Sequence, residues 1–105
     1  MISHKEIESA LDFLRDSARP AAEAIAKHDY VKSYSSVVLA EIMAEHQDLT
    51  LGAQEREAKR SQRYKDHLEI VETARVDAEK YGFLIDAAKA KISAWQTMAK
   101  TGVDL

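Results

Sequence analysis

Apolar residues recur every three or four positions along most of the chain, which is the spacing of amphipathic α-helices. The first stripe consists of Ile7, Leu11, Leu14 and Ala18, with Ala10 and Phe13 beside it. Ser3 followed by Glu6 has the pattern of a capping box, so a first helix is expected over about 4–18. Pro20 is expected to end this helix, because the residue before a proline avoids helical geometry. One kinked helix that runs through Pro20 is the alternative.

The next stripe predicts a second helix over about 20–46, and Pro20 suits its first turn because its missing amide proton is not needed there. The stripe consists of Ala24, His28, Val31, Tyr34 or Ser35, Val38 and Ile42. Its alternation of three- and four-residue steps fits a packed amphipathic helix. The pattern stops over about 47–52, where Asp48 or Thr50 can cap the helix that follows. We therefore expect a turn there.

The longest stripe lies within a predicted helical segment over about 53–100, and it keeps a heptad repeat. One row consists of His67, Ala74, Tyr81, Ala88 and Trp95, and the other of Val71, Ala78, Ile85, Ile92 and Ala99. Steps of four and three residues that alternate over several heptads are typical of coiled coils. Ser61 can cap a break inside the segment, and Gly82 can mark a close helix crossing. Gly102 suits the position just after the helix.

The expected fold class is all-α within one domain, residues 1–105. The chain has only 3 glycines and 1 proline, which disfavours the many turns of a β-sandwich or an α/β fold. The short turn favours antiparallel neighbours, so a short N-terminal helix and a long, coiled-coil-like helical hairpin are expected. Two long helices bury little apolar surface, which favours completion of a bundle by dimerisation. The candidate oligomer seam consists of Val71, Ala78, Ile85, Ile92 and Trp95.

Charge and cysteine content narrow the function classes. The net charge is −3, which argues against strong non-specific attraction to nucleic acid or to an anionic membrane but is compatible with a local basic patch. The absence of cysteine excludes disulfides and thiolate chemistry. The sequence has no run of about 18 apolar residues and no secretory signal pattern at its start. We expect a cytoplasmic protein that does not engage a membrane.

Residues with chemical potential are sparse and scattered. The histidines, which lack the helical spacing of a two-ligand metal site, are His4, His28, His46 and His67. No serine lies in a Gly-x-Ser-x-Gly motif, and three scattered glycines cannot form a phosphate-binding loop. We therefore expect no catalytic, metal or cofactor site, and no enzyme. His28 and His67 both fall on predicted stripes, so they are candidates for a pH-sensitive contact if they meet.

A basic segment over 56–65 is the main candidate surface for a partner. The candidate residues are Arg56, Lys59, Arg60, Arg63 and Tyr64. The four cations share one helix face and can bind phosphates, while the adjacent tyrosine can stack on a base. A solvated face with Glu–Arg pairs is the more common outcome for such a run. The segment can also face an acidic surface on its own helical partner or on a second subunit.

One further pattern combines short motifs from both halves of the chain. The motifs are the Arg56-Glu57-Ala58 run, Tyr64, a long charged helix, the Ile92-x-x-Trp95 motif at the end of that helix, and Pro20 after a short first helix. Together they resemble small helical proteins encoded in bacteriophage and prophage genomes, and the resemblance covers nearly the whole chain. It implies a phage accessory protein in the cytoplasm of a bacterial host. Genes of this kind can lie near recombination or replication functions, which supports a nucleic-acid role, but the resemblance assigns no functional residue.

The expected function is that of a non-enzymatic helical interaction or assembly module. In this hypothesis the chain self-associates through the candidate oligomer seam, as a homodimer, and presents the basic segment 56–65 to a protein partner. The alternative is a nucleic-acid-associated accessory factor that uses the same segment to bind DNA or RNA.

Overall fold

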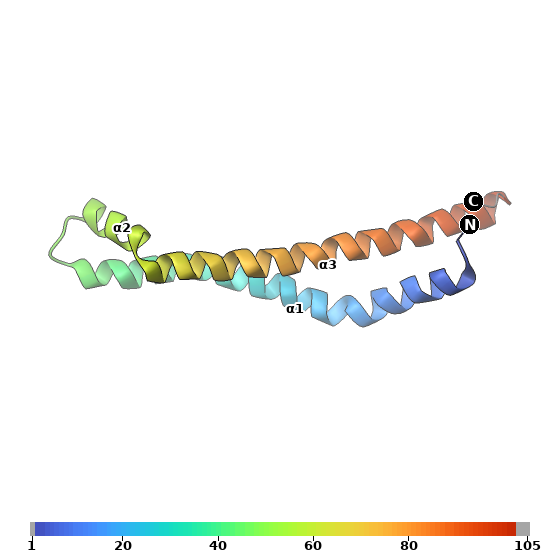
Figure 1. The fold of residues 1–105 in the computed structure, drawn as a ribbon, viewed down its shortest axis with the longest axis horizontal. Coiled ribbons are helices and arrows are strands. Elements are labelled where there is room, and N and C mark those ends of the chain that lie inside the picture. The colour runs from blue at the N-terminus through green and yellow to red at the C-terminus, as the bar shows by residue number, and fades with distance from the viewer. Residues whose placement is uncertain (1, 103–105) are drawn as a thin grey trace. The chain divides into compact units, whose positions relative to one another are not determined.

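The computed structural model describes residues 2–102, and all regular structure in this range is helical. The elements are α1 (His4–Met43), the 3-10 helix η1 (Ala44–His46), α2 (Leu51–Arg60) and α3 (Gln62–Thr101), drawn in Figure 1. The protein is therefore all-α, as its hydrophobic pattern predicts.

The chain packs as two compact units, and α1 and α3 contribute to both. The terminal unit consists of Met1–Glu23 and Ala78–Leu105, and the central unit consists of Ala24–Asp77. In the terminal unit the rings of His4 and Trp95 meet edge to face, with centroids 5.8 Å apart. In the central unit, which also contains α2, Arg63 contacts Glu45. The α1 and α3 segments run in opposite directions within each unit (Figure 1).

Helix α1 is one helix through Pro20, so the expected break between two helices at this residue is wrong. A proline inside a helix removes one backbone hydrogen bond and crowds the preceding turn, at a cost of about 3 kcal/mol. Good helix formers follow it, and Ser17 and Ala21 on either side are buried. Packing on this face favours continuation of the helix. The α-helix ends at Met43, and the 3-10 helix η1 continues the helical structure to His46, where the sequence pattern also stops.

The other helix boundaries depend on side-chain caps. The Ser3 hydroxyl accepts a hydrogen bond from the Glu6 amide (3.2 Å), as the capping-box pattern predicts. Thr50 caps α2 by accepting from the Ala53 amide (3.3 Å). The predicted break at Ser61 is present, and its hydroxyl accepts from the Tyr64 amide (3.2 Å) in the first turn of α3. Gly102 ends α3 with a positive φ of 72°.

The buried stripe of α1 keeps one heptad phase along the whole helix. Its N-terminal members are Ile7, Ala10, Leu14, Ser17 and Ala21, each buried or half-buried. Leu11 and Ala18, predicted to belong to this stripe, are exposed instead. The wrong prediction for these two residues has the same cause as the wrong break at Pro20. The buried stripe of a separate short helix does not have to stay in phase with the stripe of the next helix. Further along, Ser35 rather than Tyr34 occupies the stripe.

The buried stripe of α3 follows the predicted heptads from His67 to Trp95, with every member buried or half-buried. At the C-terminal end Met98 is buried and the predicted Ala99 is exposed. Gly82 does not mark a close crossing, because a β-carbon added there would meet no heavy atom within 4 Å. The repeat therefore holds for about four heptads and then shifts by one residue.

The two units bury their apolar side chains with different sets of helices. A cluster in the central unit joins all three helices through Val38, Ile42 and Ala58, with Tyr64 packed against it. The buried apolar side chains of the terminal unit are Ile7, Ala10, Ala21, Ala88 and Met98. No large side chain is completely buried anywhere in residues 2–102. The core is therefore thin in both units.

Candidate interaction surface

The candidate oligomer seam lies against the chain's own α1 segment in each unit. Its members Val71, Ala78, Ile85, Ile92 and Trp95 are all half-buried. The Trp95 ring contacts His4, and Ala88 on the same stripe shares a hollow with Ala10 of α1. The chain's own α1 therefore covers part of the candidate oligomer seam. Only the parts of these helices that stay exposed are available to a second chain.

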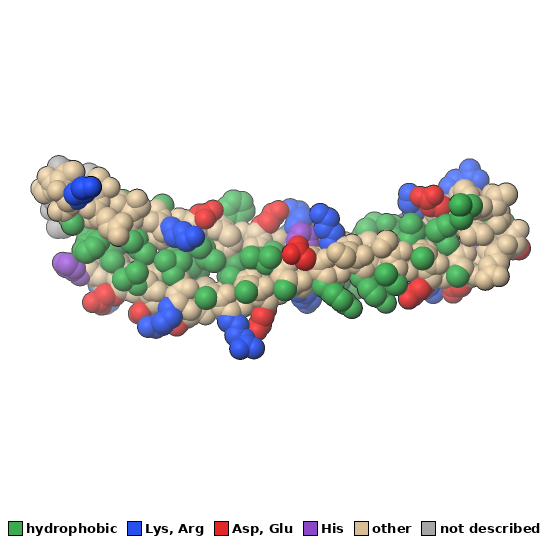
Figure 2. Space-filling model, turned by 180° about the vertical axis from the view of Figure 1, so that it is seen from behind, with side chains coloured by type: hydrophobic (Ala, Val, Ile, Leu, Met, Phe, Trp, Pro, Cys, Tyr) green, Lys and Arg blue, Asp and Glu red, His purple; other side chains and the backbone are tan. Residues whose placement is uncertain are grey.

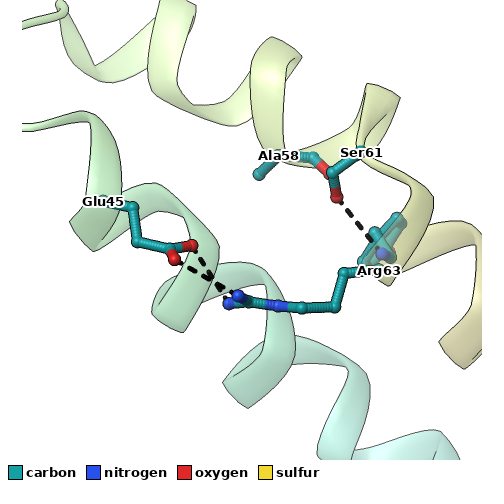
Figure 3. Close-up of polar contacts among 5 residues, drawn as sticks. Glu45, Ala58, Ser61 and Arg63 are labelled. Atoms are coloured by element: carbon teal, nitrogen blue, oxygen red, sulfur yellow. Dashed lines mark hydrogen bonds and ion pairs between the residues drawn. The ribbon is translucent and has the colours of Figure 1, made fainter.

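The basic segment carries its cations in ion pairs with nearby carboxylates. Lys59 pairs with Glu55 at 2.8 Å, and Arg60 with Glu57 at 3.4 Å, both within α2. Arg63, at the start of α3, reaches across to Glu45 at 3.1 Å, in the 3-10 helix η1 that follows α1 (Figure 3). These contacts match the expected Glu–Arg pairs and a face directed at an acidic group of the helical partner.

The electrostatics of this segment are mild because its ion pairs face solvent. The hydrogen bond that Lys59 donates lowers the pKa of Glu55, and the positive charge of Lys59 is the second cause of this shift. The same bond and the carboxylate charge raise the pKa of Lys59. Water screens both groups, so the pair contributes little to stability.

Tyr64 is placed for packing rather than for stacking on a base. Its side chain is half-buried against the cluster of Val38, Ile42 and Ala58. Among the candidate residues of the basic segment, Arg56 is exposed and makes no ion pair within residues 2–102. The structure thus places three of the four cations in ion pairs with carboxylates. Tyr64 packs where α1, α2 and α3 meet.

A buried histidine links α1 and α3 in the central unit. The Nε2 atom of His67 lies 2.9 Å from the Val31 carbonyl oxygen and 3.0 Å from the Ser35 hydroxyl. The Ser35 hydroxyl also donates to the Val31 carbonyl at 3.4 Å. His28, the other histidine on a predicted stripe, is not a hydrogen-bond partner of His67, and the observed partners lie about one and two turns further along α1. This small network satisfies the polar atoms on an otherwise apolar stripe.

A hollow in the terminal unit lies between the start of α1 and the C-terminal half of α3 and measures about 640 Å³. Its apolar lining consists of Ala10 and Phe13 from α1, and of Leu84, Ala87 and Ala88 from α3. Charged side chains at its edge are Lys5, Glu6 and Lys91. On the face drawn in Figure 2, hydrophobic side chains gather along both helices of this unit.

The sequence reasoning missed this hollow, although a signal for it exists. Beside the heptad seam, α3 carries a second apolar row at helical spacing, formed by Phe83, Ala87, Ala90 and Ala94. Phe83 in this row is 71% exposed, so the row extends beyond what α1 covers. A helix with two adjacent apolar rows has more than one face to bury.

A second hollow, of about 440 Å³, lies in the central unit and has a more polar lining. Its lining consists of Lys27, Asp66, Glu69, Ile70, Thr73 and Ala74. Residues 2–102 contain no group of three or more His, Cys, Asp or Glu side chains arranged to hold a metal ion. No helix in the same range is long and apolar enough to cross a membrane.

A scan against protein-family models found no match, and searches of curated proteins and of solved structures found no similar protein.

Proposed function

We propose that this chain is a non-enzymatic helical assembly module that self-associates as a homodimer. The observation that carries the proposal is the large apolar surface that the single chain leaves open. Phe83 and Leu84 in the terminal unit are substantially exposed, and so are Ile25, Tyr30 and Ile70 in the central unit. Exposed apolar groups in such number are typical of surfaces that bind another protein.

The exposed area of the chain supports the same conclusion. A compact monomer of 11.8 kDa exposes about 5,900 Å². This chain exposes 7581 Å², an excess of about 1,700 Å². A standard interface buries about 800 Å² on each partner, so the excess is sufficient for one stable dimer contact. In the proposed assembly, the coiled-coil-like helical hairpin completes a bundle by pairing with a second hairpin.

The biological setting follows from the sequence resemblance and is part of the proposal. It is that of a phage or prophage accessory protein acting in the bacterial cytoplasm and presenting a surface to a protein partner. The basic segment 56–65 is the proposed partner surface, and its cations Arg56 and Lys65 form no ion pair within residues 2–102. Its exposed ion pairs can exchange for pairs with a partner at little cost.

The test of the proposal is the mass in solution, measured by light scattering on a sizing column at low and at high salt. We expect twice the chain mass of 11.8 kDa at both salt concentrations, because apolar contacts are not screened by salt. A mass of one chain at every concentration tested would overturn the proposal.

Nucleic-acid binding by the basic segment is the alternative to a protein partner. The test is titration of fluorescent DNA and RNA oligonucleotides at low salt with the wild type and two charge-reversed variants. Arg60→Glu/Arg63→Glu changes the segment, and Lys89→Glu/Lys100→Glu makes the same change in net charge elsewhere. We expect no difference between the two variants. A salt-dependent affinity that only the first variant loses, with its helix content intact, would replace a protein partner with a nucleic acid.

A further inference from the structure

We propose that the hollow of the terminal unit is the homodimer contact and that its occupant is the same surface of a second copy. This inference rests on the proposed function and adds the location of the contact. The lining combines the large side chains of Phe13 from α1 and Leu84 from α3 with the small side chains of Ala87 and Ala88 from α3. Small residues beside large ones let a second helix approach closely while its own large side chains fill the gap.

The two units differ in the helices that are available to cover the α1–α3 pair. In the central unit the short helix α2 lies over the α1–α3 pair and buries Ala58 completely. Among the described residues of the terminal unit, only segments of α1 and α3 are present, and no third helix performs this role. A second copy brings two further helices with the same apolar rows, which is the arrangement of a four-helix bundle.

The charges at the edge of the hollow favour a second copy over a partner of a single charge sign. Lys5 and Lys91 carry positive charge, and Glu6 carries negative charge. None of the three forms an ion pair within residues 2–102. In a two-fold dimer the same patch meets itself, so each copy offers the other both a carboxylate and two ammonium groups. A polyanion such as nucleic acid would leave Glu6 facing like charge.

The test uses two leucines in the same unit that differ in their relation to the hollow. Leu84 lines it, whereas Leu11 is not among the lining residues, and the two are 43% and 51% exposed. We expect Leu84→Glu to raise the dimer dissociation constant at least about 30-fold, because a carboxylate would be buried at the contact. Leu11→Glu should leave the constant within about threefold of wild type. Sedimentation equilibrium measures both, and circular dichroism checks the helix content.

A second pair of variants keeps the inference testable if Leu84→Glu fails to fold. Ala87→Glu and Ala18→Glu both replace an exposed alanine of the terminal unit, and only Ala87 lines the hollow. Selective loss of the dimer in Ala87→Glu supports the inference. A wild-type dimer that survives the hollow variants, or that is lost equally in the controls, overturns the location and leaves the proposed function standing. A wild-type monomer overturns both.

Discussion

The central and terminal units are built from the same two long helices, but they cover their apolar faces by different means. In the central unit, α2 folds back and brings Ala58 against Val38 and Ile42, so that Ile42 is only 3% exposed. In the terminal unit the two helices meet without such an addition, and Phe83 remains 71% exposed. The comparison teaches that two packed helices bury one apolar stripe on each helix. A second apolar row on either helix is buried only when a third element packs against it.

The largest effect is expected at the three-helix cluster. Ile42→Ala should lower the free energy of unfolding by about 2–5 kcal/mol, because it removes a buried side chain and leaves a cavity. Ile25→Ala, in the same unit but 49% exposed, should cost less than about 1 kcal/mol. Urea denaturation followed by circular dichroism measures both. Equal losses would mean that α2 does not create a more complete core at this end.

An intermediate effect is expected where His67 joins the two long helices. His67→Leu should destabilise by about 1–2 kcal/mol, since the hydrogen bond between Ser35 and the imidazole is lost and the hydroxyl stays partly buried. Adding Ser35→Ala removes the second polar group and should recover part of the loss. The same urea titration provides the values. If the double variant is less stable than the single one, the network contributes more than pairwise hydrogen bonding.

The smallest effect is expected on the exposed face of α2. Glu55→Gln removes the pair with Lys59, and because both groups are exposed the melting temperature at neutral pH should barely change. Since the folded state lowers the pKa of Glu55, its contribution is present above about pH 4.5 and is lost as pH falls through the lowered value. Any small difference in melting temperature between wild type and variant at pH 7 should therefore disappear at pH 3. A large loss at pH 7 would show that α2 depends on this pair.

The heptad rows allowed the helices of the central unit to be predicted well from the sequence. The caps at Thr50 and Ser61 were identifiable because threonine and serine accept hydrogen bonds from first-turn amides. The α3 stripe was correct from His67 to Trp95 because a repeat sustained over several heptads leaves little freedom of phase. Its shift to Met98 at the end is a change of one residue that spacing alone does not determine.

The terminal unit was predicted less well for two physical reasons. Local preference disfavours a helix before proline, but burial of Ser17 and Ala21 on one continuous face outweighed it. With a break at Pro20 the pattern favours Leu11 in the buried stripe, whereas the continuous helix buries Ala10 and exposes Leu11. The hollow was missed because its lining residues come from distant parts of the sequence, and only the packed structure brings Phe13 and Leu84 together.

The most direct test of the account is hydrogen–deuterium exchange of the wild-type chain at protein concentrations well below and well above the dimer dissociation constant. The account predicts that exchange slows with concentration in peptides covering 5–13 and 84–91, which line the terminal hollow. Peptides covering Val38–Ile42 and Ala58, whose cover comes from within the chain, should exchange at the same rate at both concentrations. Slowing confined to the central unit, or none at all, would contradict the claim that a second copy covers the terminal unit.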